Sequence, residues 1–438
     1  MLEDSKNKLT RLMFSQNERR DLSSNALALH VVVGPITLPR EISIVSSMDQ
    51  NPGIGGSEFH SIQLALILRE AGFSVSLEVF GSIPKVTGVA RIERDTRLDQ
   101  SSGVRIVNTA MAVSIPRLFS ESQKLILVSH HPHDGWLKSL LKGGLRVVAV
   151  VNVGRYQFFS NKVASVKKVW LPAFTPVTSS TQNHVRSKLS YRAGHISSFH
   201  PSKGFHIIVR GWLLYVNRLV RSEQCEMQVI GADTLYRGGA AAPDGVLFPI
   251  SGRYGQRIRK QLENANPNSK KSIRFEGLIN ESPSGLIRNW NVAIFNPLGF
   301  GEADPIVIQD ALSVSTPVIA GSLFGLYDYM RFFPELTAHT SFGIAKRLSQ
   351  LDGNPELQKS IQLRTVEFYS KLCERRRRTE ALWIEAISNI SQGLSISGLD
   401  VGEKEPALWW RLIVGGLLLR MQNSVSKIFS KARLLRQS

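Results

Sequence analysis

Two acidic residues, Glu302 and Asp310, stand eight positions apart where an apolar run gives way to an expected helix. The run at 292–295 predicts a buried strand, and the helix is expected to begin at about Pro305. We expect the acids to lie about two turns apart on one helical side, where both can accept hydrogen bonds from one ligand. The helix start offers free backbone N–H groups to a diphosphate. The alternative is a pair of surface acids beside a helix start.

The elements that must position these acids alternate between strand and helix. Short apolar runs predict strands at 125–128 and 147–151, and apolar–polar alternation predicts one at 74–80. Further strands are expected at 27–33, 226–230, 273–275, 292–295 and 317–320. Helices are expected at 59–71, 203–219 and 371–390, and residues 232–270 are interpreted as a long insertion or mobile loop. This order predicts the α/β class, with two doubly wound, Rossmann-like domains.

The length of 438 residues also favours two domains over one core. We divide the chain into a polar segment 1–24, domains at 25–184 and 185–365, a C-terminal helix at 366–393, a linker at 394–406 and a basic amphipathic tail at 407–438. The polar start lacks the apolar core of a secretory signal. The two cysteines, Cys225 and Cys373, indicate a reducing compartment rather than a disulfide framework or a zinc cluster. We therefore expect a cytoplasmic protein.

The formal net charge of +19 indicates an anionic partner. Nucleic acid, anionic lipid and a phosphorylated substrate are the three candidates, and an ordinary solvated surface is the alternative explanation. Because no nucleic-acid-binding motif accompanies the charge, we expect no nucleic acid partner. Hydrophobic residues make up 42% of the chain, which excludes general disorder.

The segment 289–328 resembles the donor site of retaining GT-B glycosyltransferases of the family 4 type, also called glycosyl transferases group 1. The family pattern is a Glu, seven residues, a second Glu followed by Ala, and then Gly-x-Pro-Val. Glu302 matches the first Glu, Asp310 takes the place of the second, and Pro317-Val318 matches the strand start. The resemblance implies two domains facing a cleft, with the acceptor in the first and a nucleotide sugar in the second. It also implies sugar transfer with retention, Glu302 contacting the donor sugar and Asp310 the ribose.

Further segments resemble the same family. Lys203 and Gly204 match its Lys-Gly pair, whose lysine neutralises the diphosphate leaving group. Gly277 ends a strand where the family brings its backbone close to the base. Gly55 and Gly56 resemble the loop that reaches across the cleft to the donor phosphates. The alternatives are a helix-start lysine and a plain glycine turn.

The histidines after the strand at 125–128 lie where relatives often place a histidine near the sugar. The resemblance implies that His130 or His131 orients the acceptor or the donor sugar, with a structural or capping role as the alternative. Such enzymes usually need no metal, and the nucleotide sugar is a co-substrate, so we expect neither a metal nor a cofactor. The acceptor is expected to be a glycan or a lipid-linked glycan in polysaccharide or envelope biosynthesis.

Two positions depart from the family pattern. Ser198 stands where the family has an Arg that contacts the diphosphate, and Asp310 is one methylene shorter than Glu. Arg192 or His195 is expected to replace the missing charge if the chain is fully active. The alternative is a catalytically impaired GT-B protein that serves as a binding or scaffold subunit.

The tail at 407–438 combines Trp409, Trp410 and many leucines with interspersed arginines and lysines. Its longest uncharged stretch, 412–419, is shorter than the roughly 20 apolar residues that cross a bilayer. The pattern predicts an interfacial helix on an anionic membrane surface, at the cytoplasmic face, which suits a lipid-linked acceptor. The alternative is a helix packed back on the N-terminal domain.

Overall fold

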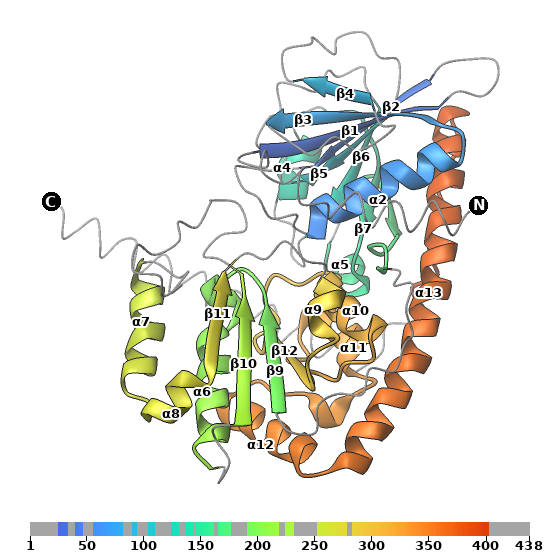
Figure 1. Cartoon of the computed structure of the whole chain (residues 1–438). Coiled ribbons are helices and arrows are strands. Elements are labelled where there is room, and N and C mark those ends of the chain that lie inside the picture. Colours follow the sequence, from blue (N-terminus) through green and yellow to red (C-terminus); the bar gives the residue numbers. More distant parts are fainter. Residues whose placement is uncertain are drawn as a thin grey trace, which may run out of the picture.

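The computed structural model describes residues 25–33, 40–46, 56–81, 90–93, 104–109, 124–130, 136–142, 145–161, 165–176, 191–218, 224–231, 252–277 and 283–402. In this part of the chain two β-sheets lie one above the other, and one long helix runs beside both (Figure 1). The predicted α/β class with two sheets is therefore confirmed. We refer to the described residues up to 176 as the N-terminal half and to those at 191–352 as the C-terminal half.

The N-terminal half is built on an eight-stranded sheet with the order β4-β3-β1-β2-β5-β6-β7-β8. Its strands are β1 (Asn25–Val33), β2 (Arg40–Ser46), β3 (Ser74–Gly81), β4 (Ala90–Glu93), β5 (Val104–Asn108), β6 (Lys124–Ser129), β7 (Val147–Asn152) and β8 (Lys167–Trp170). Strands β5 to β8 pair in parallel, and β5 and β6 are buried almost throughout. Their Val, Ile and Leu residues suit strands covered on both faces. The helices are α2 (Gly56–Glu70), α4 (Trp136–Lys142) and α5 (Arg155–Ser160).

Strand β1 departs from the doubly wound pattern predicted for this half, because it pairs antiparallel with both β2 and β3. An apolar run indicates that a strand is buried, but it does not encode the direction of its neighbours. Strand β2 was not predicted at all. It lies between β1 and α2 in the chain.

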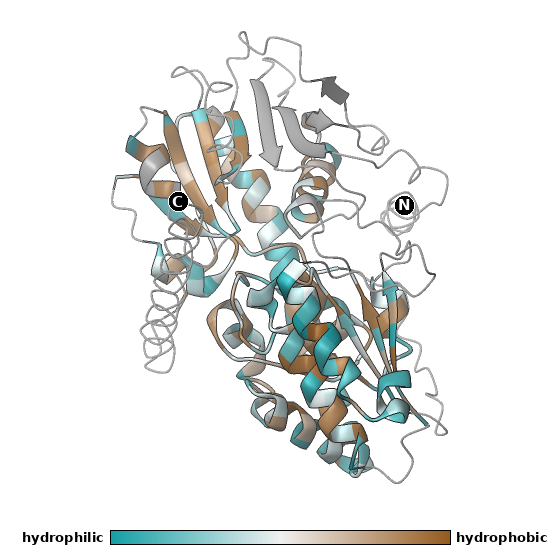
Figure 2. Cartoon of the chain, turned by 90° about the vertical axis from the view of Figure 1, so that its left-hand side faces the viewer, coloured by the Kyte–Doolittle hydropathy of each residue, from teal (hydrophilic) through white to brown (hydrophobic). Residues whose placement is uncertain are grey.

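The C-terminal half contains a five-stranded sheet with the order β11-β10-β9-β12-β13, and its pairings are parallel. The strands are β9 (Tyr191–Ile196), β10 (Cys225–Ile230), β11 (Ile273–Gly277), β12 (Val292–Phe295) and β13 (Val318–Ala320). The helices are α6 (Phe205–Val216), α7 (Gly252–Glu263), α8 (Pro267–Lys271), α9 (Pro283–Ile287), α10 (Ile306–Ser313), α11 (Tyr327–Met330) and α12 (Ser341–Asp352). In Figure 2 both the strands and the helices drawn in colour show hydrophobic as well as hydrophilic residues.

Helices α7 and α8 lie in the region 232–270, which was interpreted as a long insertion or loop. Helix α7 buries Gly255, Ile258 and Leu262, and it packs on α6. Because few small or apolar residues interrupt the Arg, Lys and Gln residues of this segment, the helical spacing of its buried positions was not recognised in the sequence. Residues 232–251 lie outside the described residues.

Helix α13 (Pro355–Ser391) connects the two halves. It begins well before residue 366, the predicted start, because Asn354 caps it and its side chain accepts a hydrogen bond from Leu357 N at 2.9 Å. Its first part contributes Ile361, Phe368 and Leu372 to the core of the C-terminal half, and its last part contributes Trp383, Ala386 and Ile387 to the core of the N-terminal half. The two cores are therefore spanned by one helix (Figure 1).

Across the described residues, no helix is both long and apolar enough to cross a membrane. The segment 1–24, Gly55, His131 and the tail at 407–438 lie outside the described residues.

Candidate functional site

Lys203 is positioned at the carboxyl end of β9 by a short 3-10 turn, η2 (Pro201–Lys203), which precedes α6. Gly204 ends this turn with a φ of 68°, a left-handed backbone conformation that favours glycine. A Cβ at Gly204 would lie 3.0 Å from Cγ of Pro297. The glycine therefore lets the turn pack closely on the loop that carries Glu302.

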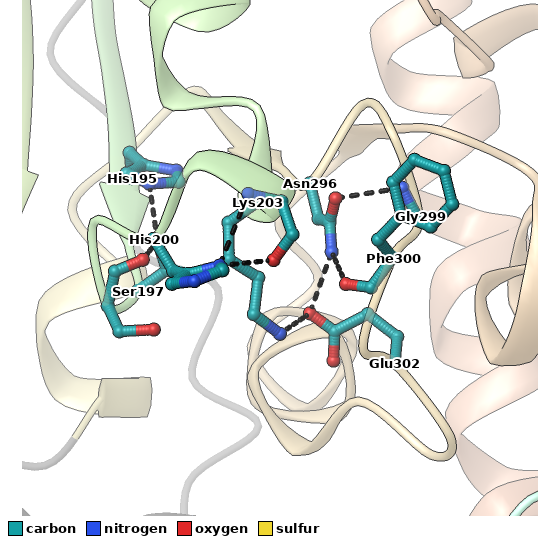
Figure 3. A network of polar contacts seen from close by, with 10 residues as sticks. His195, Ser197, His200, Lys203, Asn296, Gly299, Phe300 and Glu302 are labelled. Atoms are coloured by element: carbon teal, nitrogen blue, oxygen red, sulfur yellow. Dashed lines mark hydrogen bonds and ion pairs between the residues drawn. The ribbon is translucent and has the colours of Figure 1, made fainter. Parts of the chain in front are cut away.

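Two of the charged residues predicted for this site, Lys203 and Glu302, are in direct contact (Figure 3). Lys203 Nζ donates to Glu302 Oε1 at 2.6 Å. Asn296 Nδ2 donates to the same oxygen at 3.0 Å. The side chains of the pair are 20% and 19% exposed, respectively. The site thus offers a ligand one cation and one carboxylate, both largely shielded from water.

Asn296 shapes the loop between β12 and α10. Its Oδ1 accepts from Gly299 N at 2.8 Å, and its Nδ2 also donates to Phe300 O at 2.9 Å. Gly299 and Gly301 adopt φ values of 74° and 77°, which L side chains rarely take. Sequence reasoning treated Asn296 only as the end of a strand. Its amide, in contact with both the loop backbone and Glu302, is a site residue that this reasoning missed.

We expected Glu302 and Asp310 to lie on one side of a helix, and this prediction is wrong. Glu302 lies in the loop before Pro305, the N-cap of α10, whereas Asp310 lies inside α10. Because proline starts the helix there, the first acid cannot belong to it. Asp310 is 6% exposed, and desolvation alone raises its pKa to about 8. No hydrogen bond to its carboxylate is formed within the described part of the chain.

Arg192 does not replace the charge missing at Ser198. It lies near the start of β9, at the opposite end of the strand from Ser198, with its Nε 3.6 Å from Glu226 Oε2. In a strand the chain advances by about 3.3 Å per residue, which separates the two ends by most of the sheet height.

His195 does not supply the missing charge either. Its Nδ1 lies 2.7 Å from the Ile294 carbonyl oxygen, and its Nε2 lies 2.7 Å from Ser197 Oγ (Figure 3). Since a carbonyl can only accept, the ring proton is on Nδ1, and the Ser197 hydroxyl donates to Nε2. Burial is the main cause that lowers the pKa of His195 to about 4, so the ring is neutral at pH 7.

Two of the three glycines predicted to face the donor, Gly56 and Gly277, belong to the described residues, and they lie at different places. Gly56 is the first residue of α2, and a Cβ there would lie 3.5 Å from Ile306 Cδ1 at the start of α10. The start of α2 therefore touches the helix that carries Asp310. Gly277 ends β11 with a φ of 68°, and its carbonyl accepts from Gly231 N at 2.8 Å. Gly55 lies outside the described residues.

His130 follows β6 and packs edge-on against His60 of α2, with ring centroids 5.2 Å apart. His60 is 1% exposed and stacks on Phe174 at 4.9 Å. Burial lowers the pKa of His60 to about 3, and neither of its ring nitrogens has a hydrogen-bond partner among the described residues. His130 thus lies beside the helix that begins at Gly56, and His131 is not described. Among the described residues, no group of three or more His, Cys, Asp or Glu is placed to hold a metal ion.

A second polar cluster, which sequence reasoning missed, ties the Glu302 loop to the N-terminal half. Asp304 Oδ2 accepts from Ala173 N at 2.9 Å, and Asp304 Oδ1 accepts from the Tyr329 hydroxyl. Arg375 of α13 lies 3.7 Å from Asp304 Oδ1 and donates to the Tyr329 oxygen at 3.1 Å. We refer to Asp304, Ala173, Tyr329 and Arg375 as the clasp. Its members are far apart in sequence, so no local sequence motif predicts it.

No protein-family model matches the chain, and no curated protein matches it in sequence. Among solved structures, it is similar to the pneumococcal O-GlcNAc transferase GtfA in complex with UDP and GlcNAc, with 11% identity, a TM-score of 0.48, and 66% of this chain and 57% of that chain covered. It is also similar to a variant of S. aureus TarM in complex with fondaparinux, alpha-GlcNAc-glycerol and UDP, with 12% identity, a TM-score of 0.48, and coverage of 80% and 64%.

A third similar structure is the UDP-forming α,α-trehalose-phosphate synthase from Burkholderia xenovorans, with 13% identity, a TM-score of 0.48, and coverage of 66% and 74%. The chain spans less than two thirds of the length of the first two of these proteins, 57% and 64%.

Proposed function

We propose that this chain is a retaining GT-B glycosyltransferase that moves a sugar from a nucleotide-sugar donor to a glycan or lipid-linked glycan. The observation that carries the proposal is the ion pair of Lys203 and Glu302 at the carboxyl edge of the second sheet. Open α/β sheets bind ligands at that edge. A glycosyl diphosphate needs a cation for its leaving phosphate and an acceptor for its sugar hydroxyls, and this pair provides both.

The proposed reaction divides the work between the two charges. Lys203 leaves Glu302 for the diphosphate and neutralises the charge that grows there as the bond from the anomeric carbon to the phosphate oxygen breaks. Glu302, held by Asn296, accepts hydrogen bonds from the sugar hydroxyls. The leaving phosphate takes the proton of the acceptor hydroxyl, whose oxygen bonds to the same face of the anomeric carbon. That route retains the anomeric configuration without an enzymic nucleophile.

Asp310 has the role of holding the ribose in this proposal. A buried carboxyl group without a hydrogen-bond partner is costly, and its raised pKa of about 8 reflects that cost. Two ribose hydroxyls that donate to it stabilise the charged form. Nucleotide binding at neutral pH then releases a proton from Asp310. Gly56, at the start of α2, and Gly277, at the end of β11, flank the space proposed for the phosphates and the base.

The test is a screen of the purified chain against a panel of nucleotide sugars, with release of the nucleoside diphosphate as the readout. We expect turnover of at least one donor and a product whose anomeric coupling in NMR equals that of the donor. Glu302→Gln, which keeps the shape and removes the charge, is expected to lower turnover by about 100-fold, or about 2.7 kcal/mol. Absence of binding to any nucleotide sugar or nucleoside diphosphate would refute the proposal.

The second candidate is a GT-B protein that binds a nucleotide sugar without turnover and acts as a binding or scaffold subunit. It is favoured by Ser198, which brings no charge, together with the distant Arg192 and the neutral His195. The same screen separates the candidates. Binding of a donor without release of its nucleoside diphosphate supports the scaffold.

For the location of the protein, we propose peripheral attachment at the cytoplasmic face of a membrane through the tail at 407–438. Its tryptophans, leucines and basic residues are typical of an interfacial helix on anionic lipid. This attachment would bring the chain to a lipid-linked acceptor.

A further inference from the structure

Helices α7 and α8 form an outer edge of the C-terminal half that is rich in cations (Figure 1). The exposed cations are Arg253, Arg257, Arg259, Lys260, Lys270 and Lys271, and the one acid in these helices is Glu263. Arg253, Arg257 and Lys260 follow each other at helical spacing, so they share one side of α7. The buried residues of α7, among them Ile258 and Leu262, occupy another side. We refer to Arg253, Arg257 and Lys260 as the α7 stripe.

The charges of the α7 stripe are not neutralised by the described part of the chain. None of the three residues forms an ion pair with a described acid, whereas Arg274, on the neighbouring β11, lies 2.6 Å from Glu276. The positive charge of Arg257 acts on the neighbouring His206. Burial is the larger cause that lowers the pKa of His206 to about 4, and the charge of Arg257 lowers it further. The stripe is thus available to an external anion.

The shape and composition of the stripe decide which anion fits. The outer side of a helix is convex, so it cannot enclose a small ion. The tyrosine of α7, Tyr254, is engaged by α6, since its hydroxyl accepts from His206 N at 3.0 Å. It is therefore not free to stack on a sugar or a base. A planar array of anionic headgroups, in contrast, meets several cations of a convex surface at once.

We propose that the α7 stripe docks the C-terminal half onto an anionic lipid surface. This docking is independent of the proposed glycosyl transfer and of the tail at 407–438. Because Tyr254 contacts His206, shortly after Lys203, the stripe begins at the edge of the sheet that carries the Lys203–Glu302 pair. A membrane bound there lies beside the candidate site.

The test uses the full chain and vesicles of phosphatidylcholine with and without phosphatidylserine, at low salt. The stripe variant is Arg253→Glu, Arg257→Glu and Lys260→Glu combined. Its matched control is Lys359→Glu, Arg377→Glu and Arg378→Glu, which makes the same charge change at exposed positions of α13, on the opposite side of the molecule (Figure 1). Each basic residue near an anionic surface contributes about a fivefold factor in binding. We expect the stripe variant to lose at least about 100-fold in vesicle partition, and the control to lose far less.

Three outcomes would overturn the proposal. An equal loss in both variants would mean that only net charge matters, and no loss in the stripe variant would mean that other residues bind the lipid. Loss of duplex DNA binding with unchanged vesicle binding would assign the stripe to nucleic acid. The neutral variant Arg253→Gln, Arg257→Gln and Lys260→Gln, with a thermal unfolding midpoint equal to that of the wild type, guards against misfolding. Nucleoside diphosphate binding should persist in all variants, so the result does not depend on the proposed function.

Discussion

Lys203 and Glu302 contact each other directly, so a diphosphate has to compete with a carboxylate for the lysine. The benefit of Lys203 should therefore appear mainly as the leaving group departs and its charge grows. We expect Lys203→Ala to lower turnover on the order of 100-fold, about 2.7 kcal/mol, in steady-state assays of donor cleavage. Lys346→Ala, at an exposed position of α12, is the control and should leave turnover unchanged. Equal turnover in a folded Lys203→Ala variant would show that the lysine does not contact the phosphate.

His60 links a single buried residue to the pH dependence of stability. Its pKa is lowered from 6.5 to about 3 in the folded chain, so below pH 6.5 the unfolded chain binds a proton that the folded chain does not. The stability is complete above that pH and falls as the pH drops, levelling off below about 3. At pH 5.5 the loss is about 1.4 kcal/mol.

Urea unfolding at pH 7.5 and pH 5.5 measures this effect. His60→Leu removes the titration, so its free energy of unfolding should fall less between the two pH values than that of the wild type, by about 1.4 kcal/mol. The remaining dependence includes His195, whose pKa is also lowered, to about 4. Identical pH dependence in both proteins would mean that His60 is hydrated or paired in solution.

At this same scale, the sequence predicted the charged members of the candidate site but not their supports. Lys203 and Glu302 stood out because their types and neighbours match a known pattern, and the structure brings them together. Asn296 and Asp304 were missed since their roles depend on contacts that no local spacing encodes. The prediction that Arg192 or His195 replaces the charge missing at Ser198 was wrong for a similar reason. The sequence places Arg192 in a strand, but it does not show that Arg192 lies at the end of the sheet opposite Ser198.

At the scale of elements, the clasp fixes the Glu302 loop to α13 and to the N-terminal half. The Asp304 side chain is only 4% exposed. Burial raises its pKa, whereas Arg375 and the hydrogen bonds from Tyr329 and Ala173 oppose that rise. Removing the Asp304 carboxylate leaves the buried positive charge of Arg375 without this partner. We expect Asp304→Ala to lower the free energy of unfolding by about 3 kcal/mol or more in urea titrations.

The control for the clasp is an exposed ion pair on the same helix. Glu367 and Lys371 lie 2.7 Å apart with side chains 68% and 61% exposed. Glu367→Ala should lower the free energy of unfolding far less than Asp304→Ala does, because solvent screens an exposed pair. Similar losses for Asp304→Ala and Glu367→Ala would show that the clasp contributes no more than a surface pair.

Elements were predictable where one pattern dominated. Strands β6, β7 and β12 are short apolar runs, β10 begins with apolar–polar alternation, and α6 shows its period clearly. The antiparallel direction of β1 was not predictable, because pairing depends on residues far along the chain. The early start of α13 was missed for a different reason. Its first turns mix charged residues with apolar ones at exposed positions, such as Leu363 and Val366, and this blurs the buried stripe.

At the scale of the whole molecule, the two halves are held by α13 and the clasp. The whole chain carries a formal net charge of +19. The basic residues of the tail account for part of this charge: Arg411, Arg420, Lys427, Lys431, Arg433 and Arg436. A chain stopped at Pro406 loses these cations and the tail tryptophans together. If the tail is the main anchor, this truncation should remove most of the binding to anionic vesicles.

Flotation of the full chain and of the chain stopped at Pro406 with anionic and neutral vesicles measures this contribution. A further variant, Trp409→Ala and Trp410→Ala, keeps every charge and removes two large apolar side chains. An interfacial helix uses both apolar burial and charge, so this variant should bind anionic vesicles less well than the full chain but better than the truncated one. High salt should weaken the double-alanine variant more than the full chain, because charge then supplies a larger share of its binding. Equal binding by the truncated and full chains would show that the tail is not the anchor and would leave membrane attachment to surfaces such as the α7 stripe.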